Sequence, residues 1–236
     1  MAQAVVIIPS YNEKENIEKI IRKVFSLDDN FHILVVDDGS PDGTAQIVKN
    51  LTAEFPGRLF LEGRKGKLGL GTAYIHGFKW ALGKNYDFIF EMDADFSHNP
   101  DDLPRLLNAC KNGADVAVGS RYTGGGNVEN WPLNRKMLSQ FASLYVRMIL
   151  WMPVMDPTAG FKCYKKEVLS KLNLDAIRFI GYAFQIEMKY RAYRAGFRVV
   201  EVPITFIDRK EGVSKMSMSI FKEAFWGVIR MRLGKN

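Results

Sequence analysis

Two aspartates separated by a single alanine are the first residues in this sequence whose types and spacing suggest chemistry. The segment FIFEM at residues 88–92 leads directly into Asp93, Ala94 and Asp95. Two carboxylates this close repel one another unless a cation joins them. Mg²⁺ is commonly held by one or two carboxylates together with phosphate oxygens of a substrate. Asp93 and Asp95 are therefore candidate ligands of Mg²⁺ or Mn²⁺, and the alternative is an ordinary turn or helix cap.

A second acidic pair, Asp37 and Asp38, follows the apolar segment at residues 32–36. Acids that follow a strand in this way suit the hydroxyl groups of a ribose. The alternative is an Asx-type turn formed with Gly39 and Ser40, and the residues alone leave the two interpretations equally open.

Cationic residues in the second half are candidate phosphate ligands. Arg121 and Arg135 stand on either side of a glycine-rich loop, and a guanidinium binds phosphate through two parallel hydrogen bonds. The segment RKEGVSK, from Arg209 to Lys215, is a candidate lid over a phosphate. Taken singly, each of these residues is more typical of a plain surface charge or a solvated loop. His98, at a helix start before Asn-Pro, is interpreted as structural.

The elements that must position these residues alternate along the chain. Short β-branched or aromatic segments predict strands at 4–8, 31–36, 58–61, 88–92 and 116–118, and helical periodicity predicts helices at 13–27, 43–55, 71–82 and 101–112. Apolar strands that alternate with helices indicate a mostly parallel α/β sheet covered on both faces. Ligands of such sheets bind beyond the carboxyl ends of the strands, where the acidic residues fall. We therefore expect one site at that edge.

The second half is predicted to continue the same domain, because no linker interrupts it. We expect a long amphipathic helix at 134–150, a helix at 183–195, a strand at 198–207 and a terminal helix at 217–233. Glycines 69 and 71 in KLGLGTA are interpreted as positions of close helix packing, since no GK[ST] sequence follows them.

Charge and composition narrow the classes of partner. Residues 1–120 carry 13 Lys and Arg against 17 Asp and Glu, whereas residues 121–236 carry 20 against 9. A basic half suggests an anionic partner, which is nucleic acid, a phosphate-bearing ligand or an acidic membrane surface. No helix-turn-helix pattern or aromatic platform favours nucleic acid. The two cysteines form no CxxC motif, which argues against a zinc site or a disulfide framework and fits a reducing compartment. Neither a signal peptide nor a transmembrane segment is expected.

Nine segments in order make the sequence resemble the family 2 glycosyltransferases, and among them the dolichol- or polyprenol-phosphate mannose synthases. They read VVIIPSYNEKENI, ILVVDDGSPDGTA, KLGLGTAYIHGF, MDADFSHNP, VGSRY, WPLNRK, DPTAGFKCY, GYAFQIEM and VPITFIDRKEGVSK. The resemblance implies a nucleotide-diphosphosugar transferase fold of the GT-A type. It also implies an inverting, metal-dependent transfer of mannose from GDP-mannose to a polyprenyl or dolichyl phosphate, with Mg²⁺ or Mn²⁺ as cofactor. On this reading residues 1–120 form the nucleotide-sugar half of one catalytic domain and residues 121–236 its acceptor-facing half.

The resemblance also implies roles for individual residues. The guanosine-binding set would be Pro9, Tyr11, Glu13, Val36 and Asp38, and the metal and donor site would be Asp93, Ala94 and Asp95. Arg121 resembles the arginine at the donor–acceptor junction, Arg135 the acceptor-phosphate contact, and Arg209 and Lys215 the residues that close on the donor diphosphate. Ser97 departs from the pattern, because some members carry a glutamine there as a further metal ligand.

A lipid acceptor requires contact with a membrane, and no C-terminal transmembrane helix is expected to supply it. The terminal helix carries an apolar stripe with cations beside it, which suits an interfacial helix as well as a helix packed on the core. The 134–150 helix is a second candidate. We expect a cytoplasmic protein bound peripherally to the cytoplasmic membrane face. The competing enzyme is a family 2 transferase with another donor, such as UDP-glucose, or a saccharide acceptor, and the remote alternative is a nucleic-acid-binding module.

Overall fold

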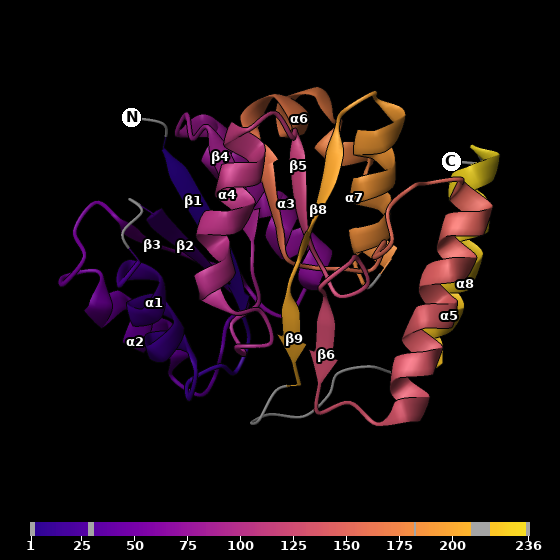
Figure 1. The fold of residues 1–236 in the computed structure, drawn as a ribbon. Helices are drawn as coiled ribbons and strands as arrows, with labels where there is room; N and C mark the ends of the chain where they lie inside the picture. Colours follow the sequence, from indigo (N-terminus) through magenta and orange to yellow (C-terminus); the bar gives the residue numbers. More distant parts are fainter. Residues whose placement is uncertain (1–2, 28–30, 182, 209–217, 235–236) are drawn as a thin grey trace.

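The computed structural model describes residues 3–27, 31–181, 183–208 and 218–234, and for residues 218–224 only the backbone. Within these residues, a seven-stranded sheet has the order β3-β2-β1-β4-β7-β5-β8 (Figure 1). Its strands are β1 (Ala4–Ser10), β2 (Phe31–Asp37), β3 (Leu59–Gly63), β4 (Phe88–Glu91), β5 (Val116–Ser120), β7 (Lys162–Lys165) and β8 (Val199–Pro203). Every neighbouring pair is parallel except those of β7, which runs antiparallel to β4 and β5. The mostly parallel sheet and its five predicted strands are confirmed, whereas β7 was not predicted.

Helices cover both faces of this sheet, as expected. The helices are α1 (Ile17–Phe25), α2 (Thr44–Leu51), α3 (Leu70–Gly83), α4 (Leu103–Lys111), α5 (Leu133–Leu150), α6 (Lys166–Lys171), α7 (Ala183–Arg194) and α8 (Met218–Leu233), with 3₁₀ turns η1 (Pro100–Asp102) and η2 (Leu174–Ala176). One apolar core joins the sheet to α1, α2 and α4, and a second joins its other face to α3, α6 and α7. The strands β1, β2, β4 and β5 are mostly apolar because both of their faces are buried.

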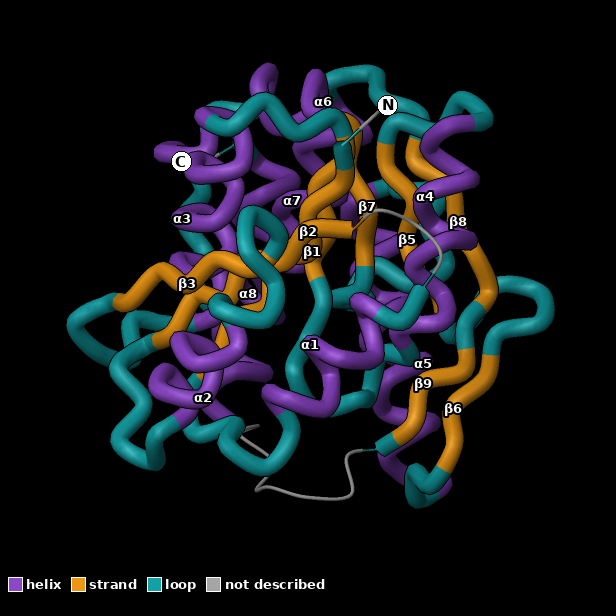
Figure 2. The backbone as a smooth tube through the Cα atoms, turned by 90° about the vertical axis from the view of Figure 1, so that its left-hand side faces the viewer, coloured by secondary structure: helices purple, strands orange, loops and turns teal. Residues whose placement is uncertain are grey.

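Beyond the ends of β5 and β8 the chain forms a second, smaller sheet. A small parallel sheet pairs β6 (Asn127–Glu129) with β9 (Thr205–Ile207), and Figure 2 shows it beside the end of β8. Ile204 connects the two sheets, since its N–H donates to Ser120 at 3.0 Å and its carbonyl accepts from Asn127 at 3.0 Å. The strand predicted at 198–207 is confirmed in place, but Ile204 divides it into β8, which pairs with β5, and β9, which pairs with β6.

Close packing of α3 against its neighbours explains two glycines in its sequence. A Cβ at Gly77 would lie 2.6 Å from Cγ2 of Ile7 in β1, and a Cβ at Gly71 would lie 2.8 Å from the Phe184 ring of α7. Any larger residue would push the helix away from the sheet. The packing interpretation of Gly71 is confirmed.

The two helices α5 and α8 lie side by side at one edge of the molecule (Figure 1). They run in the same direction, because Tyr145 stacks on Phe225 at 4.8 Å and Arg232 lies over the Trp151 ring at 4.7 Å. Val228 of α8 is buried in a third apolar cluster with residues of α5 and α7. Of the helices in the described ranges, none has the length and apolar character that crossing a bilayer requires.

Candidate active site

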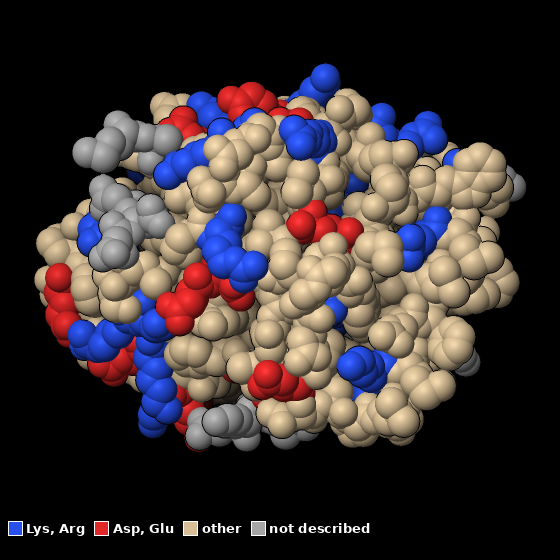
Figure 3. All heavy atoms as spheres, viewed as in Figure 1, with Lys and Arg blue, Asp and Glu red and all other residues tan. Residues whose placement is uncertain are grey.

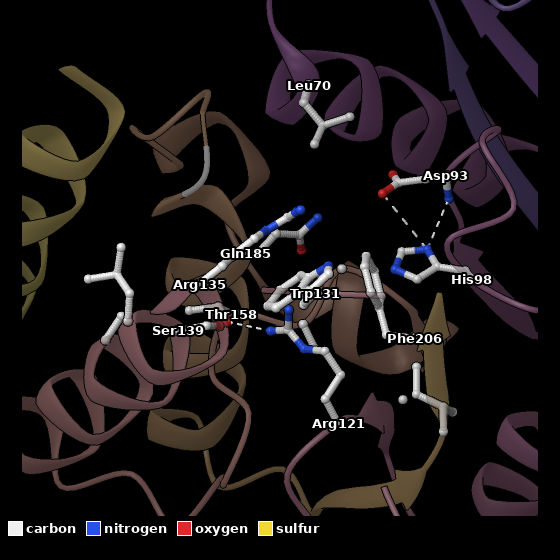
Figure 4. Close-up of a pocket in the computed structure, with 16 residues that line it drawn as sticks. Leu70, Asp93, His98, Arg121, Trp131, Arg135, Ser139, Thr158, Gln185 and Phe206 are labelled. Carbon is white, nitrogen blue, oxygen red and sulfur yellow. Dashed lines mark hydrogen bonds and ion pairs between the residues drawn. The ribbon is translucent and has the colours of Figure 1, made fainter. Parts of the chain in front are cut away.

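A cavity of about 160 Å³ opens where the loops after β4 and β5 meet α5 (Figure 4). It brings together three residues that the sequence singled out, Asp93, Arg121 and Arg135, from three separate parts of the chain. Its remaining walls are Leu70, His98, Gly119, Trp131, Leu138, Ser139, Ala142, Thr158, Ala159, Gly160, Gln185, Ile204 and Phe206. The carboxylate of Asp93 thus shares one compartment with two guanidinium groups.

Asp93 is held by two neighbours that leave its carboxylate partly exposed to the cavity. The Tyr74 hydroxyl donates to Oδ1 at 3.2 Å, and the backbone N–H of Asp93 donates to Nδ1 of His98 at 3.2 Å. Burial, followed by the negative charge of Asp93, raises the pKa of Tyr74 well above its ordinary value, so the phenol stays protonated. The Tyr74 hydroxyl therefore supports one carboxylate oxygen of Asp93 from the side away from the cavity.

His98 serves as a neutral support for this loop. Its imidazole is buried and stacks on Phe161 with ring centres 5.0 Å apart. Burial lowers its pKa, and Nδ1 accepts a hydrogen bond, which only the unprotonated nitrogen can do. The 3.9 Å approach of Nδ1 to Oδ2 of Asp93 is consequently not an ion pair. The structural interpretation of His98 agrees with this geometry, but the ring also forms part of the cavity wall.

Asp95 faces a neighbouring depression that Asn16, Lys19, Phe96, Asn99, Ile207 and Asp208 also line. Its Oδ1 accepts a hydrogen bond from the backbone N–H of Ser97 at 3.1 Å, across Phe96, whose φ is +60°. A bulky residue rarely adopts this left-handed conformation, so the turn is specified by its surroundings. Ser97 is itself buried.

The two aspartates fit a metal that is shared with a ligand. Among the described residues, no group of three or more His, Cys, Asp or Glu side chains is placed to hold a metal ion. A closed protein cage is thus not present in that part of the chain. Asp93 and Asp95 are both partly exposed carboxylates, and oxygen ligands of this kind suit Mg²⁺ or Mn²⁺ when phosphate oxygens complete the coordination.

Arg121 is held in the cavity wall by an ion pair with Asp156. Its Nε and Nη2 donate to the two carboxylate oxygens of Asp156 at 2.7 Å each, and Nη2 also donates to the Thr158 hydroxyl at 2.7 Å. Arg121 is 6% exposed and Asp156 is fully buried. Burial alone would raise the pKa of Asp156, but the charge and hydrogen bonds of Arg121 outweigh it and lower that pKa. The sequence analysis missed Asp156, although a buried arginine requires a carboxylate and DPTAGF offered one.

Trp131 lies between the two arginines (Figure 4). The guanidinium of Arg135 is 4.1 Å from the centre of an indole ring, and that of Arg121 is 5.6 Å from it. Arg135 also donates to Oδ2 of Asp208 at 2.7 Å. The indole nitrogen of Trp131 is buried and has no hydrogen-bond partner among the described residues. Trp131 was not singled out from the sequence, and its place in WPLNRK beside Arg135 was the available signal.

Gln185 is a further cavity residue that sequence reasoning missed. The buried ammonium group of Lys162 donates to its Oε1 and also pairs with Glu91 at 3.0 Å. Because the amide oxygen is thus engaged, Gln185 has its NH₂ group left to donate at the cavity wall. Its place in GYAFQIEM was the available signal.

The residues expected to bind the nucleotide lie at the carboxyl ends of β1 and β2 and in the loops that follow them. Asp38 pairs with Arg64, Nε to Oδ1 at 2.6 Å, and accepts from the backbone of Leu68. Its neighbour Asp37 forms the alternative Asx-type turn, accepting from the backbone and hydroxyl of Ser40. The side chain of Val36 is fully buried, so only its backbone is available to a ligand.

The other residues of this set differ in what they expose. Pro9, Tyr11 and Glu13 are partly exposed, whereas Ala94 is buried. The ammonium of Lys67 lies 5.3 Å from the Tyr11 ring centre, which places the loop after β3 against this group. Arg209 and Lys215 lie outside the described residues.

The chain is similar to known proteins over most of its length. The model of the family described as glycosyl transferase family 2 matches residues 5–172. The chain is 50% identical to a polyprenol monophosphomannose synthase of Mycolicibacterium smegmatis, over 99% of this chain and 89% of the relative. It is 46% identical to an undecaprenyl-phosphate mannosyltransferase of Micrococcus luteus, over 98% of this chain and 94% of the relative.

Solved structures share the fold at lower identity. Glucosyl-3-phosphoglycerate synthase from Mycobacterium tuberculosis, in complex with Mn²⁺ and UDP, matches with a TM-score of 0.69 and 19% identity, over 99% of this chain and 80% of that one. The mannosyltransferase PcManGT from Pyrobaculum calidifontis, in complex with GDP-Man and Mn²⁺, matches with a TM-score of 0.59 and 18% identity, over 99% and 63%. The expected GT-A type of fold is confirmed. The chain belongs to the family 2 glycosyl transferases.

Proposed function

We propose that this enzyme transfers mannose from GDP-mannose to a polyprenyl or dolichyl monophosphate, with inversion at the sugar carbon, and releases GDP. The observation that carries the proposal is the shared cavity, in which the carboxylate of Asp93 faces Arg121 and Arg135. A transferase that joins a phosphate acceptor to a diphosphate donor needs cations between them. The proposal is also supported by relatives named for mannosyl transfer to polyprenol or undecaprenyl phosphate.

The chemistry suits a cavity without a general base. The second pKa of a phosphate monoester is about 6, so the acceptor is mostly dianionic at neutral pH. One of its oxygens forms a bond to the anomeric carbon while the bond from that carbon to the diphosphate oxygen breaks. GDP leaves with the electron pair, and no proton has to be removed. His98 is accordingly not required as a base, and its role is to hold Asp93 in place.

The acceptor phosphate is assigned to Arg135, and the junction between acceptor and donor to Arg121. Arg135 is the more exposed of the two and keeps further donor atoms beyond the one that binds Asp208. Arg121 is fixed by Asp156 and contributes a rigid, oriented cation at the cavity wall. The nucleotide is assigned to Pro9, Tyr11, Glu13 and Asp38 with the backbone of Val36, and Arg209 and Lys215 to the donor diphosphate.

Asp93 and Asp95, with Ala94 between them, are proposed to hold Mg²⁺ or Mn²⁺ together with the donor. When bound, this ion would offset the negative charge that develops on the diphosphate leaving group. Ser97 is buried and its backbone already holds Asp95, so we assign it no metal contact.

Peripheral binding to the cytoplasmic face of a membrane is proposed to bring the enzyme to its lipid acceptor. The outer side of α5 exposes large apolar side chains, namely Leu133, Met137, Leu138, Phe141, Leu144 and Met148. Phe225 and Trp226 of α8 are exposed beside them. In Figure 3 the surface over these helices, at the right, is tan with separate blue patches and no red. Apolar residues among cations are typical of an interfacial surface.

We treat residues 1–236 as one catalytic domain, because β7 and β8 of the second half lie in the same sheet as the strands of the first. Within it, residues 1–120 are assigned to the nucleotide sugar and residues 121–236 to the acceptor and the membrane.

A donor panel tests the proposal. The purified protein is incubated with a polyprenyl phosphate, Mn²⁺ and either GDP-mannose or UDP-glucose, and the lipid product is identified by mass spectrometry. We expect polyprenyl-phosphate mannose from GDP-mannose alone. A glucosylated lipid, or transfer only to an added saccharide, would favour the alternative family 2 activities.

A further inference from the structure

A second cavity, of about 350 Å³, lies on the other side of Arg121 from the first. It is formed by α5, β6 and the loops that follow β5 and α5. The lining residues are Arg121, Tyr122, Gly126, Asn127, Val128, Lys136, Gln140, Ser143, Leu144, Arg147 and Met155. The proposed transfer reaction uses none of them except Arg121, so this cavity needs an explanation of its own.

Its helical wall is a polar stripe of α5. Lys136, Gln140, Ser143 and Arg147 follow one another at intervals of three or four residues, which places them on one side of the helix. None of the residues that line the cavity is acidic. Neither Lys136 nor Arg147 forms a salt bridge with another described residue. The cavity is therefore positively charged.

Two buried polar atoms in this wall lack partners. Ser143 is 3% exposed, and its hydroxyl makes no hydrogen bond within the described residues. The Nε atom of Arg147 is likewise buried and without a partner there. Buried donors are normally satisfied, because a donor that loses its hydrogen bond to water and gains no partner costs free energy. Unpaired donors beside two cations indicate a ligand rich in acceptor oxygens.

We propose that this cavity binds the phosphate of an anionic lipid headgroup, at a position separate from the acceptor phosphate. A guanidinium, an ammonium and a hydroxyl group together match the acceptor oxygens of a phosphate. A lipid is favoured over a soluble phosphate because exposed apolar side chains, Leu144 and Met155, stand in the cavity wall itself. Headgroup and acyl chain would thus contact adjacent parts of one surface. The inference rests on the proposed membrane association of α5.

The site is connected to the active-site cavity through Tyr122. Its ring lines the second cavity, and its hydroxyl donates to Ser139 at 2.7 Å in the wall of the first. Ser139 lies one turn of α5 beyond Arg135. A headgroup bound beside Tyr122 would hold α5 at the membrane with the acceptor-binding side of the helix facing the first cavity.

Vesicle binding by charge variants tests the proposal. The double variant K136Q/R147Q removes the two cations that α5 contributes to the cavity, and K49Q/K111Q removes two exposed lysines from α2 and α4 as a matched control. The full chain is sedimented with phosphatidylcholine vesicles that contain phosphatidylglycerol, and with pure phosphatidylcholine vesicles. Two cations lost at an anionic surface correspond to about a 30-fold weaker affinity. We expect that loss for K136Q/R147Q with the anionic vesicles and a change below about threefold for the control.

A third variant, Q140E, places a carboxylate beside Lys136 on the exposed rim and is expected to weaken vesicle binding without disturbing the core. Equal weakening by K136Q/R147Q and K49Q/K111Q would overturn the proposal, because attraction would then follow net charge alone. Inorganic phosphate provides the other arm. If it raises the melting temperature of the wild type but not of K136Q/R147Q, while vesicle binding is equal for both proteins, the site belongs to soluble phosphate and the lipid assignment is wrong.

Transfer to an acceptor dispersed in detergent separates this inference from the proposed function. We expect K136Q/R147Q to retain the wild-type rate there, since neither residue touches the active-site cavity. If the wild type shows no transferase activity, the proposed function is wrong. The comparison of vesicle binding still tests the headgroup site in that case, because it does not depend on transfer. A matching loss of activity in detergent and on vesicles would overturn the assignment of the two residues to a headgroup.

Discussion

Arg121 and Asp156 are joined by two parallel hydrogen bonds of 2.7 Å in an environment where both side chains are shielded from water. The backbone N–H of Arg121 adds a third bond to the same carboxylate at 3.0 Å. Asp156 is in turn fixed by Glu201, whose carboxylate accepts from its backbone N–H. The cation at the centre of the site is thus positioned by residues remote in sequence.

Replacing Asp156 by asparagine is expected to destabilise the fold strongly. The substitution leaves the guanidinium of Arg121 buried without a counter-charge, which costs about 3–5 kcal/mol. The matched change D208N breaks the half-exposed pair with Arg135 and is expected to cost about 1 kcal/mol or less. Urea denaturation measures both values, and equal losses for the two variants would contradict the account.

The same pair predicts a pH dependence. The folded-state pKa of Asp156 is lowered, so its contribution to stability is complete above the unfolded value of about 3.9. That contribution is lost as pH falls through the folded pKa. The difference in unfolding free energy between wild type and D156N should therefore shrink as the pH is lowered below about 4. A difference that stays constant down to the acid transition would show that Asp156 is not stabilised as an anion.

Trp131 is expected to act as a positioning residue for Arg135. W131A removes the indole on which the guanidinium lies, and a cation–π contact is worth about 0.5–2 kcal/mol. The KM for polyprenyl phosphate should rise about 2- to 30-fold, while kcat changes less. W131F keeps an aromatic face and should fall between wild type and W131A. A loss confined to kcat would show that the tryptophan does not act through acceptor binding.

The buried amine of Lys189 is expected to make stability depend on pH a second time, in the alkaline rather than the acid range. Its amine is fully buried and donates to the carbonyl of Ala159 at 2.6 Å. Burial, reinforced by the nearby Lys162, lowers its pKa well below the ordinary value. Between that lowered pKa and about 10.4 the unfolded chain binds the proton and the folded chain does not, so stability rises with pH. K189M should reduce this rise, whereas K49M on the surface should not, as urea titrations from about pH 7 to pH 10 would show. Identical pH slopes for wild type and K189M would contradict the assignment.

The sequence predicted the strands and helices well where a single periodicity dominates. The parallel strands β1, β2 and β4 are mostly apolar because both faces are covered, and that pattern is visible locally. The strand β7 was missed, since KCYK is short, has a lysine at each end and is buried only through its pairing with β4 and β5. Its Lys162 is buried in an ion pair with Glu91, and no local sequence pattern predicts that a lysine is buried at this position.

The candidate site was predictable only in part, because a local sequence pattern marks some of its residues and not others. Asp93, Arg121 and Arg135 were found because strand ends and motifs mark them, and one cavity brings the three together. Asp156, Trp131 and Gln185 depend on contacts between distant parts of the chain. Their roles emerge only when α5, α7 and the loop before β7 are placed around the sheet.

Calorimetric titration of the donor is the most direct measurement of the central claim, which is that Asp93 and Asp95 hold the donor diphosphate through a divalent ion. GDP-mannose is titrated into wild type, D93N and D95N, with Mn²⁺ and with a chelator. We expect Mn²⁺ to strengthen binding to the wild type by at least about tenfold, and neither variant to show that gain although both keep the wild-type melting temperature. Equal affinities with and without the metal, or an unchanged metal dependence in both variants, would contradict the account.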